Sequence, residues 1–333
     1  MGFCQFDNFG FDYFGFGGGA DQAAAPVVAP TIDSQSGDGV YDGVTAQTLS
    51  VTASGGGLTY QWYAGASGDT SSPVGGATNA TYDASPANPT RYWCRVTNAG
   101  GTADSTTKHI MTKSSTTFTF DLDEARGITV AETDKITAAA SQGSVALSLT
   151  NDGGANRPVL VTADTNFNSR NSIRFNNSNY FYQSVTWSNL LAVGTKHIFI
   201  VARITTLTAL KGLLSDDNVR FQIKVNAAGT GIGVFNNGSE IVTATLGANT
   251  TALIEVTHTG GNITLRINAG ATSTAASGDT TGMGTYINVG TVNGAANFIG
   301  EIGRMLMNTT VFTGEALACI RGYLGNRFGV TVS

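Results

Sequence analysis

The sequence predicts an all-β protein: an extended N-terminal arm, a first β-sandwich, and a second, larger β-sandwich with one short C-terminal helix. Three observations carry this prediction. The 333 residues include 43 glycines, and only 12% are charged, about half the usual share. Short runs alternate apolar and polar side chains, as half-buried strands do. Turns rich in Gly and Asn separate these runs, and one segment near the C-terminus has helical periodicity.

Residues 1–25 form the predicted arm and its linker. Aromatic side chains recur there on a backbone of mostly Gly, Asp and Asn, which is too flexible to fold alone. An unstructured tail is one interpretation, but such tails are usually poor in aromatic residues. A docking arm is the other, because aromatic anchors in pockets concentrate binding energy at interfaces. The rings that would dock on a partner are Phe3, Phe6, Phe9, Phe11, Tyr13, Phe14 and Phe16.

The charges and cysteines indicate the cellular compartment and the classes of partner that the chain can have. No Lys or Arg precedes Arg91, and Gly or Asp interrupts each apolar run near the N-terminus. We therefore expect neither a signal peptide nor a membrane-spanning helix. A net charge of −5 argues against nucleic acid as a partner. Cys4, Cys94 and Cys319 lie far apart in odd number, which indicates free thiols and a reducing compartment. A disulfide between chains through Cys4 is the alternative.

Residues 26–112 read as short strands of a first domain. Leu49 and Val51 share one strand face, as do Tyr92, Cys94 and Val96. The segments "YQWY" and "YWCRVTNAGG" resemble an immunoglobulin-like domain. The resemblance implies that Trp62 is the strand C tryptophan, Cys94 the second core cysteine and Tyr92 the corner tyrosine.

The chain departs from that family at strand B. Val51 or Leu49 stands where the first core cysteine belongs. The resemblance therefore implies a core without a disulfide, in which Trp62 packs on apolar side chains.

Residues 113–333 continue the β pattern. "NNG" at 236–238 is a strong hairpin signal, and a second hairpin is expected about Gly260 and Gly261. The helix should begin after Thr313, with Glu315 in its first turn, and end at Gly329. Its apolar side chains share one face that we expect to cover an open edge or end of the sandwich: Leu317, Ile320, Leu324 and Phe328.

The end of the chain carries a second resemblance. "FIGEI" leads through a turn to "YLGNRFG", and "IRFNNSNYF" and "VTHTGGNITLRIN" precede it. These segments resemble the concanavalin-A-like, laminin-G-like lectin sandwich, which implies a jelly-roll fold. Calcium sites and glycan binding are common among such lectins, so the resemblance implies both as expectations.

Candidate chemistry is sparse. Asp121 and Asp123 are spaced to share a strand face, and we expect them to point outward into solvent, with calcium binding or catalysis as weaker interpretations. Asp216, Asp217 and Asn218 supply oxygen ligands of the kind calcium takes, although a solvated turn is the simpler interpretation. Tyr180, Tyr182 and Trp187 are the candidate aromatic residues for stacking on a sugar ring. No cofactor other than calcium is expected. No nucleophile motif or histidine pair appears, so the sequence predicts no enzyme.

The arrangement as a whole resembles phage virion proteins, in which a terminal peptide fixes β-domains to a particle. That resemblance implies a decoration protein on the virion surface, made in the host cytoplasm. It would be a homo-oligomer held to other virion proteins by the arm, with weak adhesion to host glycans and without contact to nucleic acid or membrane. A tail-fibre or receptor-binding protein, a bacterial adhesin and a glycan-active enzyme are the alternatives.

Overall fold

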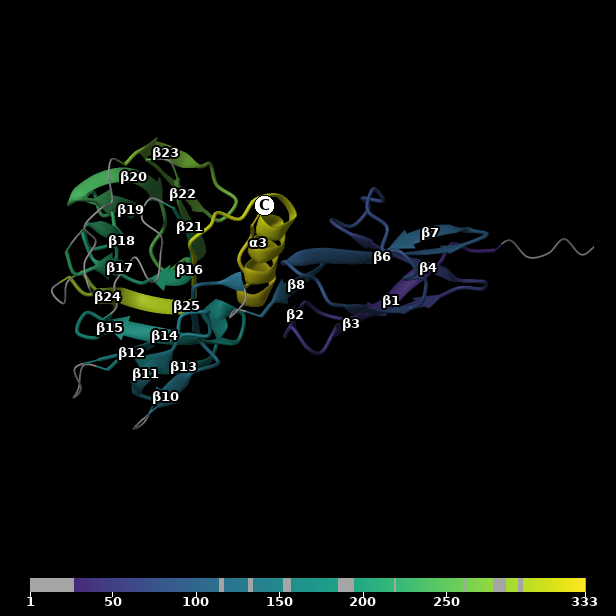
Figure 1. Cartoon of the computed structure of the whole chain (residues 1–333), viewed down its shortest axis with the longest axis horizontal. Coiled ribbons are helices and arrows are strands. Elements are labelled where there is room, and N and C mark those ends of the chain that lie inside the picture. Colours follow the sequence, from purple (N-terminus) through teal and green to yellow (C-terminus); the bar gives the residue numbers. More distant parts are fainter. Residues whose placement is uncertain are drawn as a thin grey trace, which may run out of the picture.

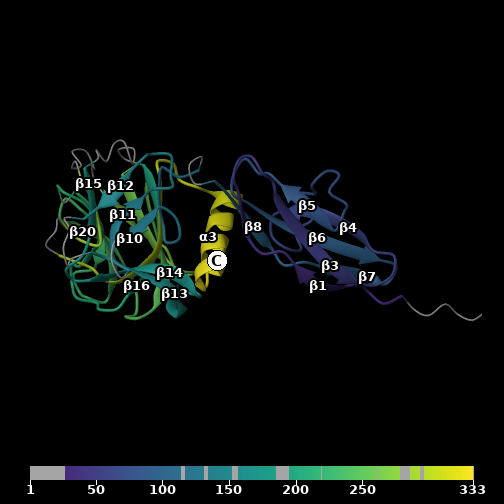
Figure 2. The same ribbon diagram turned by 90° about the horizontal axis from the view of Figure 1, so that it is seen from below.

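The computed structural model shows two β-sandwiches joined end to end, with a helix between them (Figure 1). It describes residues 27–113, 117–130, 134–151, 157–184, 195–218, 220–259, 261–277, 286–292 and 296–332. The predicted arm, residues 1–25, lies outside the described residues. A second view shows the same order of smaller sandwich, helix and larger sandwich along the long axis (Figure 2). No helix among the described residues is long and apolar enough to cross a membrane.

The smaller sandwich holds two sheets. One has the order β1-β3-β5, and the other has the order β2-β8-β6-β4 with β7 paired to β6. β1 pairs with β3 in one sheet, and β2 runs parallel to β8 in the other, so the first two strands of the domain belong to different sheets. The strands are β1 (Thr31–Gln35), β2 (Gly39–Tyr41), β3 (Gln47–Ser54), β4 (Thr59–Ala64), β5 (Thr81–Ala84), β6 (Thr90–Asn98), β7 (Gly101–Asp104) and β8 (Lys108–Thr112).

The core of the smaller sandwich forms around Trp62, as the sequence predicts. Trp62, Val51, Tyr92 and Cys94 belong to one buried cluster, and the Trp62 indole donates to the carbonyl of Asn79 at 2.9 Å. Cys94 is a free, buried thiol, and burial raises its pKa to about 11. Apolar side chains of β3 thus take the place of the disulfide partner.

The larger sandwich holds a nine-stranded sheet, β10-β11-β12-β15-β24-β17-β18-β19-β20, and an eight-stranded sheet whose strands run β13-β14-β25-β16-β21-β22-β23, with β9 paired to β25. A short 3-10 helix, η1 (Thr165–Phe167), follows β13. The first strands are β9 (Phe120–Asp123), β10 (Ile128–Val130), β11 (Ile136–Ala140), β12 (Ser148–Thr150), β13 (Val159–Asp164), β14 (Arg170–Asn176), β15 (Phe181–Ser184), β16 (Lys196–Ile204) and β17 (Gly212–Asp216). The rest are β18 (Phe221–Val225), β19 (Gly231–Asn236), β20 (Ser239–Thr245), β21 (Thr251–Thr259), β22 (Asn262–Ile267), β23 (Ser273–Ala276), β24 (Tyr286–Val289) and β25 (Ile299–Asn308).

Local sequence sets the hairpins of this sandwich. Asn237 and Gly238 have φ of 51° and 77° between β19 and β20, the left-handed pair that a two-residue hairpin turn needs. Gly261, at φ 83°, precedes β22 in the second predicted hairpin. The predicted all-β fold of sandwiches with a C-terminal helix is therefore confirmed.

The helix α3 (Gly314–Phe328) begins and ends where the sequence predicts. Thr313 is its N-cap residue, although its side chain makes no capping hydrogen bond, and Gly329 closes it at φ 69°. Its apolar face packs with side chains from the outer surface of the eight-stranded sheet: Phe199, Val201, Leu253 and Leu306. The expectation that α3 covers an edge or end was wrong, because these side chains alternate with the core-facing ones and offer a broad apolar surface to cover.

Candidate functional site

The second face of α3 contacts the smaller sandwich through polar side chains. Glu315 accepts from three nitrogens of Arg91, and these bonds join the second residue of α3 to the second residue of β6. The distances are 2.9 Å from the backbone N, 2.7 Å from Nε and 2.6 Å from Nη2. Such bidentate pairing fixes direction as well as distance. Glu315 thus serves the junction rather than only the helix dipole.

Further along α3 the contact becomes close. Cys319 lies 3.6 Å from the carbonyl oxygen of Ile110 in β8. Gly322 faces His109, and a Cβ on this glycine would lie 2.0 Å from His109 Nε2. Asn326 Nδ2 donates to Asp38 Oδ2 at 2.9 Å. The stripe Glu315, Cys319, Gly322 and Asn326 therefore seats the helix on the smaller sandwich.

Arginines of α3 tie the helix to the larger sandwich. Arg321 binds both carboxylate oxygens of Glu255, at 2.7 and 2.9 Å, and Glu255 also contacts His197 Nε2 at 3.0 Å. Burial would raise the pKa of Glu255, but His197 and Arg321 hold it below its usual value. The pKa of His197 is lowered by burial in spite of Glu255. Since α3 is bound on both sides, it couples the two domains.

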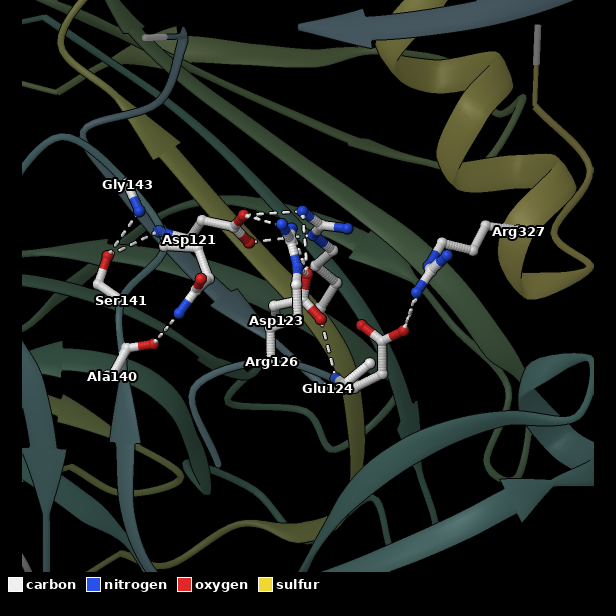
Figure 3. Close-up of polar contacts among 11 residues, drawn as sticks. Asp121, Asp123, Glu124, Arg126, Ala140, Ser141, Gly143 and Arg327 are labelled. Carbon is white, nitrogen blue, oxygen red and sulfur yellow. Dashed lines mark hydrogen bonds and ion pairs between the residues drawn. The ribbon is translucent and has the colours of Figure 1, made fainter. Parts of the chain in front are cut away.

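The predicted acidic pair lies in a buried carboxylate–arginine cluster (Figure 3). Asp121 and Asp123 are 0% and 1% exposed. Arg304 of β25 binds Asp121 at 2.7 and 3.0 Å, and Arg126 lies 2.6 Å from Asp123. The expectation of outward, solvated acids was wrong, because the pairing of β9 with β25 places both carboxylates beside Arg304.

This cluster extends to Glu124, which accepts from Arg327 of α3 at 2.6 Å (Figure 3). Burial works against the charge on Asp123, but Arg304 and Arg126 lower its pKa below the usual value. Glu124 differs, because burial and the neighbouring Asp123 raise its pKa although Arg327 is close. With their oxygens held by arginines, Asp121 and Asp123 act as ion-pair partners in this fold.

The second acidic segment lies at a strand end. Asp216 is the last residue of β17 and is buried, and its Oδ1 accepts from the backbone N of Phe221 at 3.0 Å. Asp217 and Asn218 follow in the turn. Among the described residues, no group of three or more His, Cys, Asp or Glu side chains could hold a metal ion. Calcium at Asp216, Asp217 and Asn218 stays a prediction.

The aromatic candidates lie partly outside the described residues. Tyr180 is half-buried next to β15, Tyr182 belongs to β15 through its backbone, and Trp187 lies outside the described residues. Sugar stacking by these three therefore stays a prediction. The arm residues Phe3 to Phe16 stay a prediction for the same reason.

Sequence reasoning missed a buried polar chain in the larger sandwich. Lys196 Nζ lies 3.2 Å from His258 Nδ1, and His258 Nε2 lies 2.7 Å from Ser277 Oγ. Burial lowers the pKa of Lys196 to about 8, and burial together with Lys196 lowers the pKa of His258 to about 4. The residues are far apart in sequence, and only the pairing of β16 with β21 brings Lys196 and His258 together.

No protein-family model and no curated protein matches the chain. Similar solved structures include a Trypanosoma rangeli sialidase in complex with sialic acid, at 8% identity and a TM-score of 0.42, over 72% of this chain and 43% of that one. The receptor-binding domain of botulinum neurotoxin type G has 11% identity and a TM-score of 0.44, over 64% and 51%. An arabinofuranosidase complexed with arabinofuranosyl-alpha-1,2-xylobiose has 13% identity and a TM-score of 0.45, over 60% and 52%.

These similarities correct one prediction. Glycoside hydrolases are among the similar structures, so the prediction that excludes an enzymatic activity was wrong. The matched part spans about half or less of each of the three proteins described. With TM-scores of 0.42 to 0.45, they carry no argument about a substrate of this chain.

Proposed function

We propose that this chain is a virion surface protein that attaches by its N-terminal arm and presents its larger sandwich away from the particle. The observation that carries the proposal is the position of the chain's first described residues. Val27 and Val28 contact the turn between β6 and β7. Figure 1 shows the start of the described chain at this tip of the smaller sandwich, remote from α3 and the larger sandwich. An arm that continues from this tip would hold the molecule by one end.

Contacts at this tip give the arm a fixed starting point. Asn98 Nδ2 donates to the carbonyl of Val28 at 2.9 Å. A Cβ on Gly100 would lie 2.2 Å from the Val27 carbonyl oxygen, so the backbones pass closely. The Val27 and Val28 side chains are nevertheless 50% and 77% exposed. They extend the apolar character of the arm onto the folded tip, as a docking surface would require.

The junction supports the other half of the proposal. Because α3 binds both sandwiches, an anchor at the tip would also orient the larger sandwich. The reduced core around Cys94 fits synthesis and assembly in a reducing cytoplasm. An anchor of this kind is compatible with a catalytic activity of the larger sandwich.

The test is co-sedimentation with purified virus particles from the lysate that yields the protein. The full chain should sediment with particles, and a chain starting at Pro26 should stay in the supernatant. A full-length variant with Phe6, Phe9 and Phe11 changed to Ser should also fail to bind. Its matched control changes Asp7, Asn8 and Asp12 to Ala and should bind like the wild type. If the truncated chain sediments as well as the full chain, or neither does, the proposal fails.

A further inference from the structure

We infer that the pocket where α3 and both sandwiches meet binds a small ligand carrying a carboxylate or phosphate group. The pocket has a volume of about 360 Å³, within the range of ligand sites and suited to a small molecule. Three parts of the chain line it: the smaller sandwich, the start of β14, and the last turns of α3. The lining includes Asp38, Lys108, Arg170, Tyr323, Asn326 and Arg327.

The charges of this pocket favour an anion. Lys108, Arg170 and Arg327 face a single lining carboxylate, Asp38. Both oxygens of Asp38 are already used: Oδ1 accepts from the backbone N of His109 at 2.8 Å, and Oδ2 accepts from Asn326 at 2.9 Å. These bonds hold Asp38 in place, and its charge offsets part of the Lys108 charge, which leaves three lining cations facing one carboxylate.

The side chains of two of the cations have no hydrogen-bonded or ion-paired partner within the part of the chain that the structure describes. Their charged groups make no hydrogen bond or ion pair there; Lys108 is half-buried and Arg170 is exposed. Burial lowers the pKa of Lys108, which reports the unfavourable desolvation of its charge. A partly desolvated charge such as that of Lys108 gains from a close counter-charge, and an oxyanion between Lys108 and Arg170 would give both cations a charge-assisted hydrogen bond.

One neutral hydroxyl and one fixed guanidinium complete the site. Tyr323 is 7% exposed and lines the pocket, and its hydroxyl has no hydrogen-bond partner among the described residues. Arg327 is held by Glu124 through Nε and Nη2, so its guanidinium is fixed in place beside the pocket. A hydroxyl donor and an oriented guanidinium beside two unpaired cations suit an acidic sugar or a phosphorylated small molecule.

The site draws its groups from both domains, so it exists only while the junction is closed. Lys108 belongs to β8, Arg170 to β14, and Tyr323 to α3. A ligand bound here would stabilise the closed junction by its free energy of binding. This inference goes beyond the proposed virion role and does not depend on the arm.

The experiment is calorimetric titration of the full chain with inorganic phosphate and with D-glucuronate at constant ionic strength, with D-glucose as the neutral control. We expect saturable binding of at least one anion and none of glucose. Saturation by phosphate alone would indicate a phosphorylated ligand, and saturation by glucuronate alone a sugar acid.

Variants locate the site. Lys108→Met and Arg170→Gln should each weaken anion binding about tenfold. Arg220→Gln is the matched control, because Arg220 is an exposed arginine that binds Asn237 and does not line the pocket. Thermal melting confirms that each variant is folded. The inference is overturned if neither anion saturates the wild type at millimolar concentration, or if Lys108→Met and Arg170→Gln bind as tightly as Arg220→Gln does.

Discussion

Substitution of Gly322 by alanine should open the junction without weakening the helix. The added Cβ would lie 2.0 Å from His109 Nε2, 2.4 Å from Cδ2 and 2.7 Å from Cε1. The ring has little room to move, since its Nδ1 lies 3.2 Å from Asp38 and the residue is buried. Overpacking of this kind costs about 1–3 kcal/mol, while alanine favours the helix itself by about 1 kcal/mol.

The assay is alkylation of Cys319, which the closed junction buries against Ile110. A cost of this size raises the open fraction, and with it the alkylation rate, about 5- to 150-fold. Peptide mass spectrometry follows Cys319 and Cys94 separately. Cys94 is the internal control, because it lies in the core of the smaller sandwich.

Removing the clash should reverse the effect. The double variant Gly322→Ala with His109→Ala should alkylate Cys319 more slowly than Gly322→Ala alone, since the ring that meets the new methyl group is gone. The reasoning is refuted if Gly322→Ala leaves the rate at Cys319 unchanged. It is also refuted if Cys94 accelerates as much as Cys319, because that would be unfolding of the smaller sandwich.

Two further predictions concern the larger sandwich. Asp121→Asn should lower the free energy of unfolding, measured by urea titration, by about 3 kcal/mol, because buried Arg304 loses its main counter-charge. The control variant Asp104→Asn breaks the more exposed pair with Arg95 and should cost less than about 1 kcal/mol. Equal losses in the two variants would contradict this prediction. Burial and Lys196 lower the pKa of His258 from 6.5 to about 4. Between these two pH values the unfolded chain binds a proton at His258 that the folded chain does not bind. The contribution of His258 to stability is full above pH 6.5 and is lost as the pH drops toward 4, by about 3 kcal/mol at most. His258→Asn should remove that part of the pH dependence, and an unchanged slope would refute the assignment.

Features fixed by neighbouring residues could be predicted from the sequence. The Asn237–Gly238 turn follows from the left-handed backbone that only a few residue types adopt easily. The cluster of Trp62 with Cys94 follows from strand alternation and from the resemblance of the first domain. The ends of α3 at Thr313 and Gly329 follow from capping chemistry.

Features that depend on contacts between residues far apart in the sequence could not be predicted. Asp121 was expected to point into solvent, because nothing near it in sequence shows that Arg304 pairs with it across β9 and β25. Lys196 and His258 meet only through strand register. On α3, the apolar face was visible, but the second face consists of small and polar residues, which give no hydrophobic signal. Its spacing of four, three and four from Glu315 to Asn326 was the one local sign of a second contact surface.

In the proposed attachment, the arm holds the chain by the tip of the smaller sandwich and the larger sandwich points away from the particle. Electron cryomicroscopy with averaging of particles that carry the full chain tests it most directly. We expect two lobes in line, with the smaller lobe at the particle surface and the larger lobe outside it. A larger lobe seated on the surface, with the smaller one outside, would overturn the proposed attachment.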